Sequence, residues 1–174
     1  MGGAGVERDA AAGGGRQRAG GGSVERVRAA LRAAAHPDTI RAFPEGTRSA
    51  AEAAAAVGCA VAQIAKSLVF RAGARPVLVI ASGANRVDLA KVAQAIGQPV
   101  RRADGGWVRD ATGFAIGGVA PVGHPVPPIA LVDEDLFVFD RVWAAAGSPF
   151  HLFETTPAEL LRLSGGRRAA VRED

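Results

Sequence analysis

The sequence has little of several residue types, and each shortage excludes a class of protein. Its 174 residues include one cysteine, Cys59, which rules out an internal disulfide and a zinc site built from several cysteines. There is no tyrosine, and the two tryptophans and seven phenylalanines are too few for an extended platform that stacks single-stranded RNA. The three histidines are scattered and match no metal-ligand spacing. What remains is a chain that must be held together by an apolar core.

Several catalytic and targeting motifs are also missing. The chain has no Gly-x-Ser-x-Gly elbow, no P-loop and no Gly-x-Gly-x-x-Gly turn after a strand. Residues 1–22 lack the apolar segment of a signal peptide. The longest run without charge, residues 111–132, contains four prolines and four glycines and cannot form a membrane helix. We therefore expect a soluble, cytoplasmic protein.

Composition divides the chain into two unequal parts. Residues 1–22 contain nine glycines and no apolar periodicity, so burial cannot offset the entropy lost on ordering, and we expect a disordered tail. Residues 23–174 carry 18 Arg and Lys against 15 Asp and Glu, a net charge of +3. This mild basic bias permits contact with nucleic acid without requiring it. We expect residues 23–174 to form one domain.

Helical and strand-like patterns are mixed along this domain without strict alternation. Signals for helix starts lie at Ser23, Ser49, Asp88 and Thr156, and a short helix is expected over residues 104–112. Strand-like runs are expected within residues 39–43, 67–71, 77–81, 100–103, 129–133, 141–145 and 151–153. Short connections, such as residues 73–76, imply antiparallel neighbours. The pattern predicts an α+β fold with a mixed, mostly antiparallel sheet or barrel surrounded by helices.

One lysine stands inside an apolar run over residues 60–70. Lys66 and Lys91 are the only lysines among 21 basic residues. Burying an unpaired ammonium is costly, so Lys66 must face solvent, a partner or a ligand. A chain that otherwise uses arginine keeps lysine where a compact point charge is needed. The alternative is an ordinary solvated lysine at a strand end.

A glycine- and proline-rich segment over residues 113–125 is the second candidate. At Gly117 and Gly118 no side chain stands between the backbone N–H groups and a ligand, and Pro121 stiffens the exit of the loop. A bulge or tight turn is the commoner reason for such a glycine pair. His124 follows in the same loop, where it could act as a general base, hold a polar group or be a plain surface histidine.

Four segments, taken in order, resemble the YbaK-type aminoacyl-tRNA deacylases. This family includes free-standing prolyl-tRNA-editing proteins and the editing insertion of bacterial prolyl-tRNA synthetases. The segments are Ser49-x-x-Glu52-Ala53-Ala54-x-x-Val57-Gly58, Gln63-Ile64-Ala65-Lys66-Ser67-Leu68-Val69-Phe70, Val87-Asp88-Leu89-x-Lys91 and Ala111-Thr112-Gly113-Phe114-x-x-Gly117-Gly118-Val119-x-Pro121-x-Gly123. The resemblance covers residues 23–166, nearly all of the expected domain.

The resemblance implies a domain that hydrolyses the ester between a wrong amino acid and tRNA. The family's essential lysine falls on Lys66. Its Gly-x-x-x-Pro loop falls on Gly117 to Pro121, and backbone amides there, including Gly118, would contact the aminoacyl group or the terminal adenosine. His124 is a weaker expected substrate contact. The chemistry in related enzymes uses substrate groups and an ordered water, so no protein nucleophile, metal or other cofactor is expected.

The resemblance also implies partners. These are the acceptor end of mischarged tRNA, in particular tRNA(Pro) carrying a small wrong amino acid, and prolyl-tRNA synthetase. Because fold does not guarantee activity, a non-catalytic tRNA- or synthetase-binding module on the same fold is the alternative.

Overall fold

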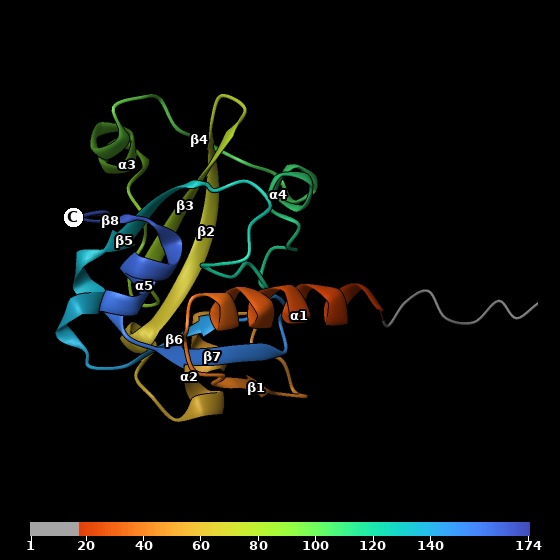
Figure 1. Cartoon of the computed structure of the whole chain (residues 1–174). Helices are drawn as coiled ribbons and strands as arrows, with labels where there is room; N and C mark the ends of the chain where they lie inside the picture. Colours follow the sequence, from red (N-terminus) through yellow and green to blue (C-terminus); the bar gives the residue numbers. More distant parts are fainter. Residues whose placement is uncertain (1–17) are drawn as a thin grey trace, which may run out of the picture.

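A long antiparallel hairpin runs through the middle of the molecule, with short strands beside each of its ends (Figure 1). The computed structural model describes residues 18–174. The strands are β1 (Ile40–Ala42), β2 (Ile64–Ala72), β3 (Arg75–Ser82), β4 (Arg101–Arg102), β5 (Ile129–Asp133), β6 (Val142–Ala145), β7 (His151–Thr155) and β8 (Arg167–Ala169). The helices are α1 (Arg18–Ala33), α2 (Ala50–Val57), α3 (Leu89–Ile96), α4 (Gly105–Thr112) and α5 (Pro157–Ser164), with 3-10 turns η1 (Val61–Gln63) and η2 (Glu134–Val138).

The eight strands form one mixed sheet in the order β1-β7-β6-β2-β3-β5-β8, with β4 paired to β2 outside this path. Four neighbouring pairs are antiparallel, namely β1–β7, β6–β7, β2–β3 and β2–β4. Three are parallel, namely β2–β6, β3–β5 and β5–β8. The predicted α+β fold with a mostly antiparallel sheet is confirmed. The described strands leave the sheet open, so the barrel alternative does not apply.

β3 has a strand on both sides and side chains packed on both faces. Leu78 and Ile80 point into a core that includes Val27 and Leu31 of α1. Val77 and Val79 alternate with them and pack on the opposite face, against Val92 of α3. Because successive side chains of a strand point to opposite faces, an unbroken apolar run such as residues 77–81 is typical of a strand buried on both sides.

Element boundaries differ from expectation in three places. α1 begins at Arg18, although Ser23 was the expected cap, so residues 18–22 are helical and the rest of the predicted tail lies outside the described residues. The strand expected within residues 67–71 begins three residues earlier, at Ile64, directly after one 3-10 turn in the Ala-rich stretch before it. Pairing of Ala65 with both β3 and β6 overrides the helix propensity of alanine there. β8 was not predicted, because its two arginines lack an apolar pattern.

Side-chain caps begin α2, α3 and α5 where the sequence predicted them. Ser49 Oγ accepts from Glu52 N at 3.1 Å, and Thr156 Oγ1 accepts from Glu159 N at 3.1 Å. Asp88 accepts from the backbone N–H groups of Ala90 and Lys91. No helix in the described part of the chain has the length and apolar character needed to cross a membrane.

The Asp88 cap generates a prediction about stability. We expect Asp88→Ala to lower the free energy of unfolding by about 1 kcal/mol, because two N–H groups of α3 lose their acceptor. Asp110→Ala is the control, since Asp110 is an exposed aspartate of α4 whose side chain makes no hydrogen bond among the described residues. Urea denaturation measures both variants, and equal losses would contradict the assigned cap.

Candidate active site

A cavity of about 530 Å³ opens beside β2. Its wall comes from the start of α2, from β2 and β4, and from the glycine-rich loop before β5. Lys66 and Gly117 both line it, together with Arg48 and Arg102. The structure thus brings the predicted lysine and the first glycine of the predicted loop, 51 residues apart in sequence, to one cavity.

Incomplete pairing of β2 creates this cavity. β6 pairs with β2 only at Ile64 and Ala65, and β4 pairs with it only at Phe70 and Arg71. Over residues 66–69 the strand therefore has β3 on one side and no described strand on the other. All four of these residues line the cavity. Because strand pairing stops there, backbone and side chains of β2 are open to a ligand along the gap.

Lys66 is held by a backbone carbonyl from the turn after β3. Its Nζ donates to Asn85 O at 2.5 Å, and the structure gives the other two ammonium hydrogens no partner among residues 18–174. Burial lowers the pKa of Lys66 below that of a free lysine; the charge of Asp133 opposes this shift and Arg86 adds to it. A half-buried ammonium with unused hydrogens, on a residue that lines the cavity, is suited to bind an anion or a developing negative charge.

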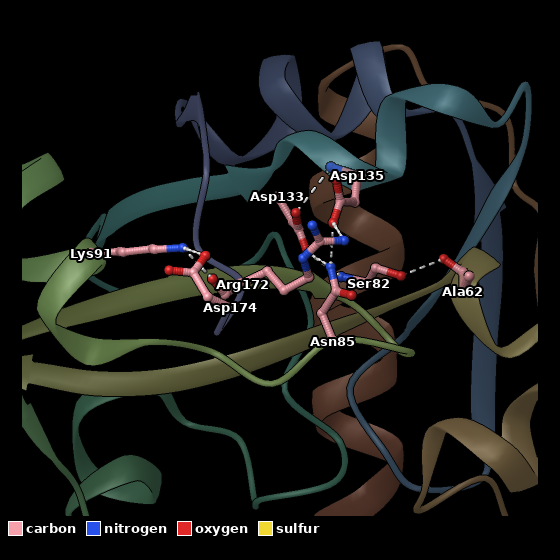
Figure 2. Close-up of polar contacts among 8 residues, drawn as sticks. All are labelled: Ala62, Ser82, Asn85, Lys91, Asp133, Asp135, Arg172 and Asp174. Carbon is pink, nitrogen blue, oxygen red and sulfur yellow. Dashed lines mark hydrogen bonds and ion pairs between the residues drawn. The ribbon is translucent and has the colours of Figure 1, made fainter.

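A buried polar network fixes that turn, as Figure 2 shows. The side-chain amide of Asn85 donates to Asp133 Oδ2 at 2.9 Å and to Asp135 Oδ2 at 2.8 Å. Ser82 N also donates to Asp133 Oδ2, at 3.0 Å, and Asp135 N donates to Asp133 Oδ1. Sequence reasoning missed this network. The available signals were an aspartate ending a buried strand and an asparagine in a turn, and neither says that the two meet.

The glycine loop contributes to the cavity through Gly117 but not through Gly118. Gly117 has φ +91 and open space where a Cβ would stand. Gly118 is buried, its N–H donates to Ala115 O at 3.0 Å, and a Cβ on it would lie 2.8 Å from Ser148 Cα. Gly118 therefore permits close backbone approach to the segment before β7.

Pro121 and His124 belong to the same segment but do not line the cavity. His124 Nε2 donates to Ala120 O at 2.7 Å, and its ring meets Phe114 edge-on at 5.2 Å. Burial lowers the pKa of His124, the hydrogen bond to Ala120 opposes the shift, and Arg26 adds to it. A neutral ring that braces the loop is what this environment favours.

Arg26 of α1 ties the same loop to the first helix. Its Nε donates to Gly123 O at 2.9 Å, and its guanidinium lies 4.3 Å from the centre of the Phe114 ring. This cation–π contact adds to the hydrogen bond. The position of the loop, and with it Gly117, therefore depends on a helix far away in sequence.

The cavity contains no activated nucleophile among its described side chains. Ser49 Oγ is used as the α2 cap, and Ser67 Oγ is buried without a hydrogen-bond partner in the described structure. Ser148 Oγ and His151 Nδ1 are hydrogen-bonded at 2.6 Å, but neither residue lines the cavity. Among residues 18–174, no group of three or more His, Cys, Asp or Glu could hold a metal ion.

Residues 44–163 match the model of the aminoacyl-tRNA editing domain family. The chain belongs to this family. The resemblance predicted from four sequence segments is confirmed, and both Lys66 and Gly117 lie inside the matched range. α1 with Arg26 precedes it, so the brace on the loop comes from outside the matched residues.

Relatives of this editing domain include proteins of known structure. A candidate trans-editing enzyme for prolyl tRNA synthetase is 47% identical with a TM-score of 0.83, over 87% of this chain and 98% of that one. The hypothetical protein APE2540 is 30% identical with a TM-score of 0.79, over 85% and 99%. YwhH, an uncharacterised protein of Bacillus subtilis, is 34% identical over 72% of this chain and 80% of its own length.

The Gly118 contact generates the second prediction. We expect Gly118→Ala to lower the free energy of unfolding by about 2 kcal/mol, because its Cβ would meet backbone atoms of Ser148 that cannot rotate away. Gly105→Ala is the control, since a Cβ there meets only Ile116 Cδ1, at 3.7 Å, in the first turn of α4. The two variants are compared by thermal and urea unfolding. A Gly118→Ala protein as stable as wild type would show that the close approach is unnecessary.

Proposed function

We propose that this editing domain is a trans-editing hydrolase that cleaves the ester bond of mischarged aminoacyl-tRNA. The proposed substrate is tRNA(Pro) carrying a small wrong amino acid. The observation that carries the proposal is the meeting of Lys66 and Gly117 in one cavity of a chain that belongs to the editing family. The relative described for prolyl tRNA synthetase supports the choice of tRNA(Pro) and of that synthetase as a partner.

The reaction places negative charge where Lys66 can stabilise it. Water adds to the ester carbonyl, the carbonyl oxygen becomes an oxyanion, and the bond to the ribose oxygen then breaks. The proton lost by the water ends on that leaving oxygen. An ammonium already held by Asn85 O needs little reorganisation to donate to the oxyanion, and its partly buried position strengthens the attraction. The backbone N–H of Gly117 is the proposed second donor.

Water, rather than a side chain, is the proposed nucleophile. Among the described residues neither the Ser49 nor the Ser67 hydroxyl is hydrogen-bonded to a basic side chain, so neither is activated for attack. The substrate's own polar groups are therefore proposed to orient the water and carry its proton. In this scheme the domain supplies binding, orientation and a positive charge, and it needs no covalent intermediate.

The cavity suits one end of a tRNA in size and character. Its volume of about 530 Å³ lies within the range of pockets that bind small ligands. Val108, Val119 and Leu152 form an apolar part of the wall, while Lys66 and Arg102 are cationic. We propose that the aminoacyl group enters this cavity and that the cationic side chains face the polar end of the acceptor strand. Substrate contact by Gly118, Pro121 and His124 stays a prediction, and a role in shaping the loop is what their positions support.

Substitution of Lys66 tests the proposal. Lys66→Ala is expected to fold normally and to lose most deacylation, about 100-fold or more, because the charge that meets the oxyanion is gone. Lys66→Arg is expected to be poor as well, since a planar guanidinium differs from an ammonium in shape and hydration. Lys91→Ala is the matched control, because the only other lysine binds Asp174 and the Arg172 carbonyl on the surface.

The measurement is release of amino acid from a panel of mischarged tRNAs. The panel contains tRNA(Pro) charged with alanine, cysteine, serine or proline, and a second tRNA charged with the same amino acids. A hydrophobic pocket distinguishes one methylene by only about 1–3 kcal/mol, so graded rates across the panel are expected. Binding of these tRNAs without release of any amino acid would favour the non-catalytic module.

A further inference from the structure

We propose that Asp133 is a positioning residue for Lys66. Its buried carboxylate fixes the turn whose Asn85 carbonyl holds the ammonium, and its negative charge offsets the cost of keeping that ammonium partly buried. The inference rests on the proposed role of Lys66 in ester hydrolysis. It assigns a task to two residues that sequence reasoning did not single out.

The geometry of Asp133 is that of a fixed internal anchor. Asp133 is the last residue of β5 and is 0% exposed. Both oxygens of its carboxylate accept hydrogen bonds. Its three donors within the described structure are neutral, namely Ser82 N, Asp135 N and the Asn85 side-chain amide. A buried carboxylate without a cation nearby is costly even when it is hydrogen-bonded. Asp133 has no ion pair within 4.0 Å among the described residues.

Asn85 connects the anchor to the ammonium. Its side-chain amide binds Asp133 and Asp135, its N–H donates to Ser82 O at 2.9 Å, and its carbonyl accepts from Lys66 Nζ. With the side chain and N–H both held, the carbonyl has little freedom to move. The ammonium of this cavity-lining residue is thereby held by a group that is itself fixed by a carboxylate.

The charges around Lys66 identify Asp133 as the compensating group. The charge of Asp133 raises the pKa of Lys66 against burial, and Arg86 from the same turn lowers it. Asp135, the other carboxylate on Asn85, already pairs with Arg172 at 3.2 Å. Its charge is therefore largely balanced by a guanidinium that belongs to the C-terminal segment (Figure 2). Removing the charge of Asp133 should affect Lys66 more than removing that of Asp135.

The test uses the fact that the chain has two lysines. Protein labelled with ¹³C at lysine Cε gives one NMR signal for Lys66 and one for Lys91, and Lys91→Arg assigns them. In Asp133→Asn we expect the titration midpoint of Lys66 to fall by about 1 pH unit, the usual effect of losing a nearby opposite charge. Asp135→Asn is the matched control and should shift Lys66 by less than half as much. The Lys91 midpoint should stay in place in both.

Activity against pH gives the second readout. If the ammonium is the working form, deacylation declines as Lys66 loses its proton, so Asp133→Asn should move the alkaline limb of the kcat profile to lower pH. In a Lys66→Arg background the limb caused by Lys66 should be absent, because arginine stays protonated, and the same substitution should not move the remaining profile. A merely structural role for Asp133 would lower stability without selectively moving the midpoint of Lys66.

Asn85→Ala tests whether the network positions the Lys66 ammonium. It also provides a test of the inference if Asp133→Asn does not fold. It should reduce kcat about 10- to 100-fold with little change in KM, because the carbonyl that holds the ammonium is freed. An unchanged Lys66 midpoint in folded Asp133→Asn, equal shifts in the two aspartate variants, or a wild-type kcat for Asn85→Ala would each overturn the inference. Wild-type protein that releases no amino acid would instead refute the proposed function, and the lysine titration would still decide whether Asp133 acts on Lys66.

Discussion

β2 has strand partners on both sides at its two ends and on one side only over residues 66–69. The candidate site depends on this interruption. If β4 and β6 extended until they met along β2, they would form hydrogen bonds with residues 66–69. The edge of β2 would then be fully paired, and strands would occupy the space of the cavity. Two short strands that stop short of each other leave a gap in the middle of a stable hairpin. A rigid strand thus carries Lys66, while the unpaired edge beside it leaves the cavity open.

Residues outside the cavity lining hold two parts of the site in place, namely the glycine-rich loop and Lys66. α1 reaches the glycine loop through Arg26, which binds Gly123 O and stacks on Phe114. β5 reaches Lys66 through Asp133 and Asn85. Neither brace contributes a side chain to the cavity lining, yet each restricts one wall of it. Substitutions at such positions should therefore affect the site through geometry and charge rather than through lost contact with a ligand.

Keeping the Lys66 ammonium partly buried has a cost in stability. Its lowered pKa means that the folded state disfavours the charged lysine relative to the unfolded chain. In the pH range between the folded-state pKa and that of a free lysine, the unfolded chain binds more protons, so stability contributed by this group rises with pH. The ammonium is retained although a neutral side chain would be favoured by burial, which is typical of a functional position.

The sequence by itself determined the local features. Capping residues placed α2, α3 and α5, the run over residues 77–81 predicted a buried strand, and four ordered segments predicted the editing family. It also singled out Lys66, because a single lysine inside an apolar run is unusual and can be recognised from the sequence alone. Tertiary structure alone decided that Lys66 lies inside a strand, that Gly117 lines the cavity while Gly118 packs on Ser148, and that Asp133 and Asn85 meet. Those outcomes depend on which strands pair and where the pairing stops. Such contacts join residues that are far apart in the chain, and they produce no periodic pattern in the sequence from which they could be predicted.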